Sequence, residues 1–294
     1  MNEEHLSRII ELECWQSVPD ISPLAGGMTN VNYRVTDGDK QYVARLGDDD
    51  PVHLISRNNE IATNQAAFEA GLSPELIYHQ PGIQVVRFIE GKVFEESDVR
   101  QPDNLHRIVT LIKTFHRKVP DNFRQVPVMF WVFQVLRHYR YLLNLGQSRH
   151  RNKLADLESR ANQLEKAVGP VDIVFGHNDL LPANIIDDGE RLWIIDFDYA
   201  GFNSPIFDLA NLASNNELNT EQEITMLEQY FGSALNRVQW TSYYAMKCAS
   251  LLRETMWSMV SEVHSDIDFD YVDYTQKNLN RFESTFQQFE IDYC

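Results

Sequence analysis

The chain has 294 residues, of which 43% are hydrophobic and 23% charged, and its formal net charge is −17 at pH 7. A chain of this kind folds as a globular protein with a large core. Its negative charge argues against nucleic acid and anionic membranes as partners. The sequence contains no 18-residue apolar stretch and no leader-like run after Met1, so we expect no membrane insertion and a cytoplasmic location.

The first ninety residues alternate short β-type runs with turns. Residues 1–20 have the apolar spacing of a helix that stops at Pro19. Two β-type runs flank the hairpin signal Asp37-Gly38-Asp39, and a further helix and strand follow; the expected ranges are 31–35, 41–45, 57–70 and 82–89. This order predicts a small, β-rich nucleotide-binding lobe over residues 1–90.

Beyond residue 97 the apolar spacing is mostly helical. We expect helices over 105–115, 128–145, 151–168, 206–215, 220–232, 237–263 and 270–290. The sequence therefore predicts an α+β fold whose larger, mainly helical lobe spans residues 91–294.

The segment 175–199 interrupts this helical pattern and carries polar residues of a particular kind. Two apolar runs flank the turn signal Asp187-Asp188-Gly189-Glu190, so the second run brings Asp196 back to the edge where Asn184 lies. Asp179 comes five residues before Asn184. ATP-dependent phosphoryl transfer uses one Asp to orient a hydroxyl, and an Asn and a second Asp to hold Mg²⁺ on the phosphates. We therefore expect Asp179, Asn184 and Asp196 to converge.

Three stretches of the chain resemble one family. These are HNDLLPANII with WIIDFDYAGFNSPIFDLANLA after it, LAGGMTNVNYR over 24–34, and YVARL over 42–46. They are similar to the choline/ethanolamine kinases, within the aminoglycoside-phosphotransferase and protein-kinase-like superfamily. The resemblance implies a two-lobed protein-kinase-like fold and an ATP- and Mg²⁺-dependent kinase for a small cationic alcohol, choline being favoured.

The nucleotide side is expected in the first lobe. Adjacent glycines let the backbone approach phosphates, and polar side chains beside them add hydrogen-bond donors. The candidate phosphate-binding residues are Gly26, Gly27, Thr29, Asn30 and Asn32. Taken alone, the same residues also fit a plain β-turn. The resemblance implies that Arg45 pairs with the ATP phosphates and that Glu60 holds Arg45. It places adenine against the backbone of Arg87, Phe88 and Ile89.

The catalytic roles follow from the motif and the resemblance together. Asp179 is expected to orient the acceptor hydroxyl, with Asn184 and Asp196 on Mg²⁺. His177 is expected to brace the catalytic loop by hydrogen bonding, and Asp208 to support that loop as a buried acceptor. Asp198 either supports the metal ligands or lines the acceptor pocket.

The acceptor pocket is expected to hold a cation. A quaternary ammonium has no N–H and is recognised by ring faces. Tyr199 matches an aromatic position of the choline-kinase pocket, and the family carries two tryptophans three residues apart on the helix 237–263. Here the second is Trp257, but the first position holds Glu254. A carboxylate there suits choline or a primary amine, and Arg253 is positioned to neutralise it.

Several alternatives remain open from sequence. Ethanolamine, thiamine or an aminoglycoside would serve as acceptor in the same superfamily, and the acidic run 264–273 would suit a polycation. A catalytically silent nucleotide-binding protein is the alternative of a different class, and Asp179, Asn184 and Asp196 together argue against it. The oligomeric state is not predicted.

Overall fold

The structure is a computed structural model that describes residues 2–24, 30–146, 148–265, 267 and 269–293. The chain forms two compact units. The first comprises Met1–Val93, Lys118–Val126 and Ala183–Asp198, and the second comprises Phe94–Arg117, Pro127–Pro182 and Tyr199–Cys294. The division into lobes 1–90 and 91–294 stays a prediction.

An antiparallel sheet of five strands dominates the first unit. Its order is β1-β2-β3-β5-β4, with the bounds β1 Asp20–Leu24, β2 Val31–Asp37, β3 Lys40–Leu46, β4 Leu76–Gln80 and β5 Ile83–Arg87. In β2 and β3 every second residue is buried, as expected for strands with one face on a core. The predicted hairpin joins β2 to β3, and Gly38 adopts φ +65° in its turn. Strand β4 was not predicted from the sequence; it pairs with β5 through a register shift after Leu76.

The first unit also contains the helices α1 (Glu3–Ile10) and α2 (Arg57–Glu69). Residues from α1 and the strands form one apolar core, which comprises Ile9, Leu12, Tyr33, Val35, Tyr42, Ala44, Leu46, Ile83 and Val85. The expectation of a helix up to Pro19 was wrong, because α1 ends at Ile10. The indole N–H of Trp15 donates to the carbonyl of Ile9 (2.6 Å). This hydrogen bond takes the place of the backbone hydrogen bond that the Ile9 carbonyl would accept if the helix continued.

The hairpin predicted around the turn 187–190 is present in the first unit. Strands β8 (Ile185–Asp187) and β9 (Leu192–Ile194) pair antiparallel, and β6 (Lys92–Val93) pairs with β8. The carboxylate of Asp188 accepts the backbone N–H groups of Glu190 and Arg191 at 2.8 Å each. The bond from Arg191, the indole bond from Trp193 and the bond from Glu190 lower the pKa of Asp188 to about 2. A charged side chain therefore fixes this turn at neutral pH.

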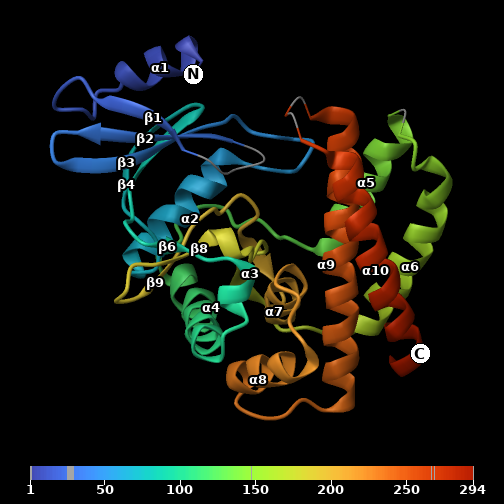
Figure 1. The fold of residues 1–294 in the computed structure, drawn as a ribbon. Coiled ribbons are helices and arrows are strands. Elements are labelled where there is room, and N and C mark those ends of the chain that lie inside the picture. Colours follow the sequence, from blue (N-terminus) through green and yellow to red (C-terminus); the bar gives the residue numbers. More distant parts are fainter. Residues whose placement is uncertain (1, 25–29, 147, 266, 268, 294) are drawn as a thin grey trace. The chain divides into compact units, whose positions relative to one another are not determined.

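The second unit is mainly helical (Figure 1). Its helices are α3 Glu96–Val99, α4 Pro102–Asn122, whose last turn belongs to the first unit, α5 Val132–Leu145, α6 Leu154–Val168, α7 Pro205–Asn215, α8 Thr220–Phe231, α9 Arg237–His264 and α10 Tyr271–Tyr293. Helices α5, α6, α7 and α10 pack against α9. The apolar residues along α9 are buried from Ala245 to Val260, whereas Val263 near its end is exposed. Strands β7 (Val174–Gly176) and β10 (Gly201–Asn203) form a short antiparallel pair. The predicted catalytic residues lie between these two strands in the sequence. Among the described residues, no helix has the length and apolarity needed to cross a membrane.

We expect Gly38→Ala to lower the free energy of unfolding by about 1 kcal/mol, because an L-residue is strained at φ +65°. A Cβ at this position would meet no atom within 4 Å, so the loss comes from the backbone and not from a clash. Urea unfolding measures it. Gly38→Asn is the matched control and should lose less, since Asn tolerates the left-handed region; equal losses for the two variants would contradict the backbone explanation.

Candidate active site

A buried carboxylate holds the loop that carries the predicted catalytic residues. Asp208 on α7 accepts the backbone N–H groups of His177 (2.8 Å) and Asn178 (2.7 Å), and the ring Nε2 of His116 lies 2.8 Å away. Burial by itself would raise the pKa of Asp208, but the hydrogen bond and charge of His116, with the loop N–H, outweigh burial and lower it. The ionised side chain thus fixes the loop backbone, in the position expected for Asp208.

Within this loop, Asn178 adopts a left-handed backbone conformation with φ +66°. Its side-chain Nδ2 donates to the carbonyls of Tyr199 (3.0 Å) and Gly201 (3.1 Å), which ties the loop to the segment before β10. The backbone N–H of Asp179 donates to Nδ1 of the buried His177 (3.3 Å). These bonds are of the bracing type that the sequence predicted for His177.

The carboxylate of Asp179 contacts a buried arginine. Nη1 of Arg253 on α9 lies 3.1 Å from Oδ1 of Asp179 and 3.1 Å from Oε2 of Glu254. The Arg253 side chain is 2% exposed and that of Asp179 15%. Burial would lower the pKa of Arg253, but Asp179, Tyr199 and Glu254 outweigh it and raise the pKa, so the guanidinium stays charged. From sequence, Arg253 was considered only as a neutraliser of Glu254, because its distance from Asp179 depends on the tertiary fold.

Of the four predicted acceptor-pocket residues, Tyr199, Glu254 and Trp257 lie together in the second unit, whereas Asp198 belongs to the first. The indole N–H of Trp257 donates to the hydroxyl of Tyr199 (3.1 Å), and the Arg253 guanidinium lies 4.2 Å above the Tyr199 ring. The hydroxyl of Tyr274 donates to Oε1 of Glu254 (2.7 Å). Rings of Tyr271 and Tyr274 meet Trp257 edge to face, with centroids 6.0 and 6.5 Å away.

Both of these tyrosines come from α10, and sequence reasoning missed them. Their spacing of three residues indicated a shared helix face, but not which helix that face meets. Burial, followed by the charge of Glu254, raises the pKa of Tyr274. Its hydroxyl therefore keeps its proton and remains a donor to Glu254 at neutral pH.

The first unit holds a second set of paired charges. Nη2 of Arg45 on β3 lies 2.8 Å from Oδ1 of Asp196 and 2.9 Å from Oδ1 of Asp198, and Nε lies 3.3 Å from Oε1 of Glu60. Burial would lower the pKa of Arg45, but these three carboxylates outweigh it and raise the pKa. The structure thus brings Arg45 to Glu60, as expected, and also to Asp196 and Asp198.

Arg57 is a further cation in this set that the sequence analysis did not name. Its Nη1 lies 2.6 Å from both Oε2 of Glu60 and Oδ1 of Asp198. Its place three residues before Glu60 on a predicted helix was the available signal, since such residues share a face. Glu60 also accepts a bond from Gln84, and burial raises the pKa of Glu60 although Arg45 opposes this.

Carboxylate oxygens of Glu60, Asp196 and Asp198 lie within 4.8 Å of one another. Asp196 adopts φ +67° and its side chain is 27% exposed, a strained conformation of the type found at functional positions. The backbone N–H of Ile195 donates to the carbonyl of Asn184 (3.0 Å), so the hairpin brings Asn184 and Asp196 to one edge as predicted. A donor set made of oxygen atoms fits Mg²⁺.

Asp179 belongs to the second unit, whereas Asn184 and Asp196 belong to the first. The convergence of all three therefore stays a prediction.

The nucleotide-side residues are described in part. Asn30 is buried and its Nδ2 lies 3.4 Å from Oδ2 of Asp198, while Asn32 pairs with Arg45 across β2 and β3. A crevice in this unit is lined by Asn30, Gly47, Gly82, Arg45, Arg57, Glu60, Ile61, Gln80, Ile83 and Gln84. Gly26, Gly27 and Thr29 lie outside the described residues.

The residues predicted to bind adenine are Arg87, which ends β5, and Phe88 and Ile89 directly after it. The N–H groups of Arg87 and Phe88 donate to the carbonyls of Glu75 (2.9 Å) and Gln41 (3.0 Å), respectively. Both donors are thus used within the sheet, and the Arg87 side chain pairs with Glu75 (3.1 Å). Ile89, directly after these two residues, is half-buried and keeps its place as a candidate for adenine contact.

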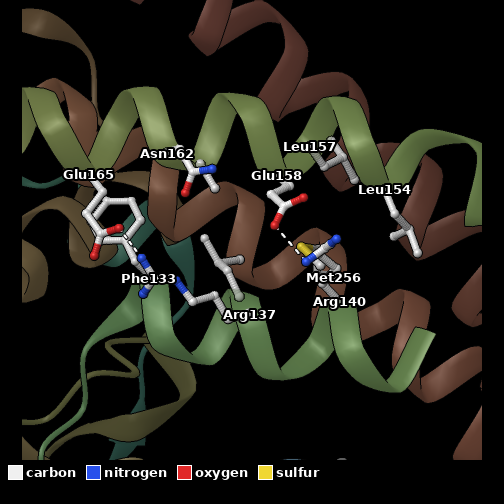
Figure 2. A pocket seen from close by; sticks show the side chains of 11 residues that line it. Phe133, Arg137, Arg140, Leu154, Leu157, Glu158, Asn162, Glu165 and Met256 are labelled. Atoms are coloured by element: carbon white, nitrogen blue, oxygen red, sulfur yellow. Dashed lines mark hydrogen bonds and ion pairs between the residues drawn. The ribbon is translucent and has the colours of Figure 1, made fainter. Parts of the chain in front are cut away.

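Another pocket of the second unit lies between α5 and α6, with Met256 of α9 at its base (Figure 2). Its apolar lining includes Phe133 and Leu157, and the pairs Arg137–Glu165 and Arg140–Glu158 join the two helices across it. The predicted site residues do not line this pocket. Its lining is that of an interface between two amphipathic helices.

The model of the family described as choline/ethanolamine kinase matches residues 21–247. The chain belongs to the choline/ethanolamine kinase family. As a member of this family, it is a phosphotransferase that acts on the alcohol group of a small amino alcohol.

Individual relatives agree with the family assignment. The protein LicA of Haemophilus influenzae is 26% identical over 264 residues, which cover 87% of this choline/ethanolamine kinase family member and 76% of LicA. A probable ethanolamine kinase of Arabidopsis thaliana is 26% identical, with coverage of 95% and 85%. The crystal structure of choline kinase LicA from Streptococcus pneumoniae is 24% identical and covers 96% of this chain and 97% of that chain with a TM-score of 0.76. This last likeness confirms the predicted α+β kinase-like fold.

We expect Asp208→Asn to lower the free energy of unfolding at pH 7 by about 3 kcal/mol, because it removes a buried charged acceptor. The folded-state pKa of Asp208 is lowered, so its stabilisation is full above the unfolded-state pKa of about 4 and disappears as the pH falls through the folded-state pKa. Urea unfolding from pH 7 to 3 should show the difference between the two proteins narrowing below pH 4. Asp273→Asn, at an exposed carboxylate on α10, is the control and should change stability by less than about 0.5 kcal/mol. A difference for Asp208→Asn that is independent of pH would contradict the role of its charge.

Proposed function

We propose that this family member transfers the γ-phosphate of ATP to choline and releases phosphocholine. The observation that carries the proposal is the group formed by Tyr199, Trp257, Tyr274 and Glu254, which Arg253 links directly to Asp179. Rings with one carboxylate among them suit a compact organic cation. The hydroxyl of that cation would lie at Asp179, a short carbon chain away from the ammonium.

In this mechanism Asp179 orients the hydroxyl and accepts its proton as the hydroxyl attacks. The pair Arg45 and Glu60 serves the phosphates: a guanidinium binds phosphate oxygens bidentately, and Glu60 holds its position. Asn184 and Asp196 would hold Mg²⁺, with Asp198 and Glu60 carboxylates nearby, and the ion supplies charge neutralisation on the phosphates. Positioning and electrostatics account for catalysis in this class, without a covalent enzyme intermediate.

The phosphates of the nucleotide would lie at Arg45, next to the crevice that Asn30, Arg45 and Arg57 line. Arg45 is engaged with Asp196 and Asp198 in the structure, so phosphate binding exchanges these carboxylate contacts for phosphate contacts. Arg57 stays on Glu60 and Asp198 during this exchange, and it keeps the carboxylates neutralised. Adenine would lie against the backbone at Ile89.

Ethanolamine is the second candidate, and a specific observation favours it. The Arg253 guanidinium covers one face of the Tyr199 ring, so that face is not offered to a quaternary ammonium. Glu254, in turn, presents a carboxylate that a primary ammonium can bond by N–H donation, which choline cannot do. The acceptor therefore depends on whether the rings or the carboxylate dominate recognition.

The acceptor assay measures ADP release with Mg²⁺-ATP and choline, ethanolamine, thiamine or kanamycin. We expect the highest kcat/KM for choline, because Trp257 and Tyr274 provide ring surfaces next to a carboxylate. The Asp179→Ala variant should lose all but about 1% of kcat, as positioned proton acceptors contribute about 10²-fold or more. A higher kcat/KM for ethanolamine would replace choline as substrate, and the absence of turnover with all four alcohols would contradict the proposal.

We expect Glu254→Gln to lower kcat/KM for ethanolamine about tenfold more than for choline. Ethanolamine loses a charge-assisted hydrogen bond, whereas choline loses only a general attraction to the carboxylate. Steady-state kinetics with both alcohols measure the ratio. Glu262→Gln is the control, since this carboxylate on the same helix pairs with Arg149 and His150, and it should leave the ratio unchanged. Equal losses with the two alcohols for Glu254→Gln would contradict a direct contact with the ammonium.

A further inference from the structure

The side chain of Asp179 and its backbone are held by different contacts. Asp208 fixes the loop through the N–H groups of His177 and Asn178, but these bonds leave the side-chain torsions of Asp179 undetermined. A carboxylate that must present one oxygen to a hydroxyl needs its own support. Nη1 of Arg253 contacts Oδ1 of Asp179 at 3.1 Å, and thereby connects a loop side chain to the buried helix α9.

The guanidinium of Arg253 is itself held from three directions. It contacts the carboxylates of Asp179 and Glu254 through the same nitrogen, and its Cζ lies over the Tyr199 ring, 4.2 Å from the ring centroid. Glu254 is held in turn by the hydroxyl of Tyr274. The helix that carries Arg253 packs against α5, α6, α7 and α10. Asp179 is therefore connected through this cation to a buried helix that four other helices pack against.

The burial of this arginine is not explained by its own hydrogen bonding. Its Nε is buried and has no hydrogen-bond partner among the described residues, although a buried unpaired donor is costly. Replacing a buried ion pair by apolar residues is often neutral or stabilising. A cation placed only for stability would satisfy its donors, whereas this one is placed to meet Asp179 and Glu254 together.

We propose that Arg253 is a positioning residue for the phosphoryl transfer, which fixes the rotamer of Asp179 so that its carboxylate faces the acceptor hydroxyl. The inference rests on the proposed function, in which Asp179 is the residue that orients this hydroxyl. Arg253 acts through Asp179 and does not itself contact substrate. Its effect on the rate must therefore depend on the presence of the Asp179 carboxylate.

A double-mutant cycle tests this dependence. Arg253→Met should lower kcat about 10²-fold while leaving KM for ATP unchanged, since misplacement of a catalytic group has an effect of this order. In an Asp179→Asn background, the same substitution should lower kcat less than about threefold, because no carboxylate remains to be positioned. The assay is single-turnover ADP formation with the acceptor that gives the fastest wild-type turnover among choline, ethanolamine, thiamine and kanamycin. An equal factor in both backgrounds would overturn the proposal and assign Arg253 a purely structural role.

Two further variants keep the test informative. Arg253→Lys retains a buried cation but not the planar fork, so it should fold and still lose about tenfold in kcat at unchanged KM for ATP; unaltered kcat would overturn the proposal. If Arg253→Met does not fold, the kcat of Arg253→Lys decides the test. Lys247→Met, which breaks the ion pair with Glu223 on the same helix, is the control and should lower the melting temperature without changing kcat. Turnover of thiamine or kanamycin alone would refute the proposed substrate while leaving the cycle valid, whereas a wild-type protein inactive with all four alcohols would overturn both.

Discussion

Carboxylates that lie close together repel one another, and each unit of this protein holds its carboxylates with buried guanidinium groups. In the first unit Arg45 and Arg57 neutralise Glu60, Asp196 and Asp198. In the second unit Arg253 pairs with Asp179 and Glu254. Without these cations the groups would separate or take up protons, since buried carboxylates that lack a partner favour the neutral form. The positions of the proposed catalytic carboxylates Asp179 and Asp196 thus depend on ion pairs with arginines of their own units.

Much of the fold could be predicted from the sequence because it follows local rules. The hairpin at Gly38, the hairpin around Asp188 and the long helices are encoded by turn residues and by apolar periodicity. Strand β4 and the early end of α1 were not predicted, because a pairing with β5 and a bond from Trp15 decide them. Both depend on residues that lie outside the element concerned.

The candidate site shows the same division between local and tertiary information. Arg45, Glu60, Asp196 and Asp198 were named from motif and resemblance, and in the structure all three carboxylates contact Arg45 in the first unit. The contacts of Arg57 and Tyr274, and the contact of Arg253 with Asp179, were not predicted, because each depends on which helix face meets another element. Motifs identify groups that bear chemistry, whereas the residues that hold these groups are scattered and have no motif of their own.

The first unit is assembled from three separate parts of the chain, and this has a consequence for biosynthesis. The backbone N–H of Ile194 donates to the carbonyl of Leu72 (2.9 Å), so the hairpin 185–194 completes a structure begun far earlier in the sequence. During translation, residues up to Val93 leave the ribosome without Asp196 and Asp198, and Arg45 and Arg57 then have Glu60 but neither aspartate to pair with. The nascent N-terminal part therefore cannot reach its final charge balance until about half of the second unit has also emerged. A truncation after residue 93 would leave the same imbalance permanently, because the fragment would lack the two aspartates that pair with Arg45 and Arg57 in the first unit.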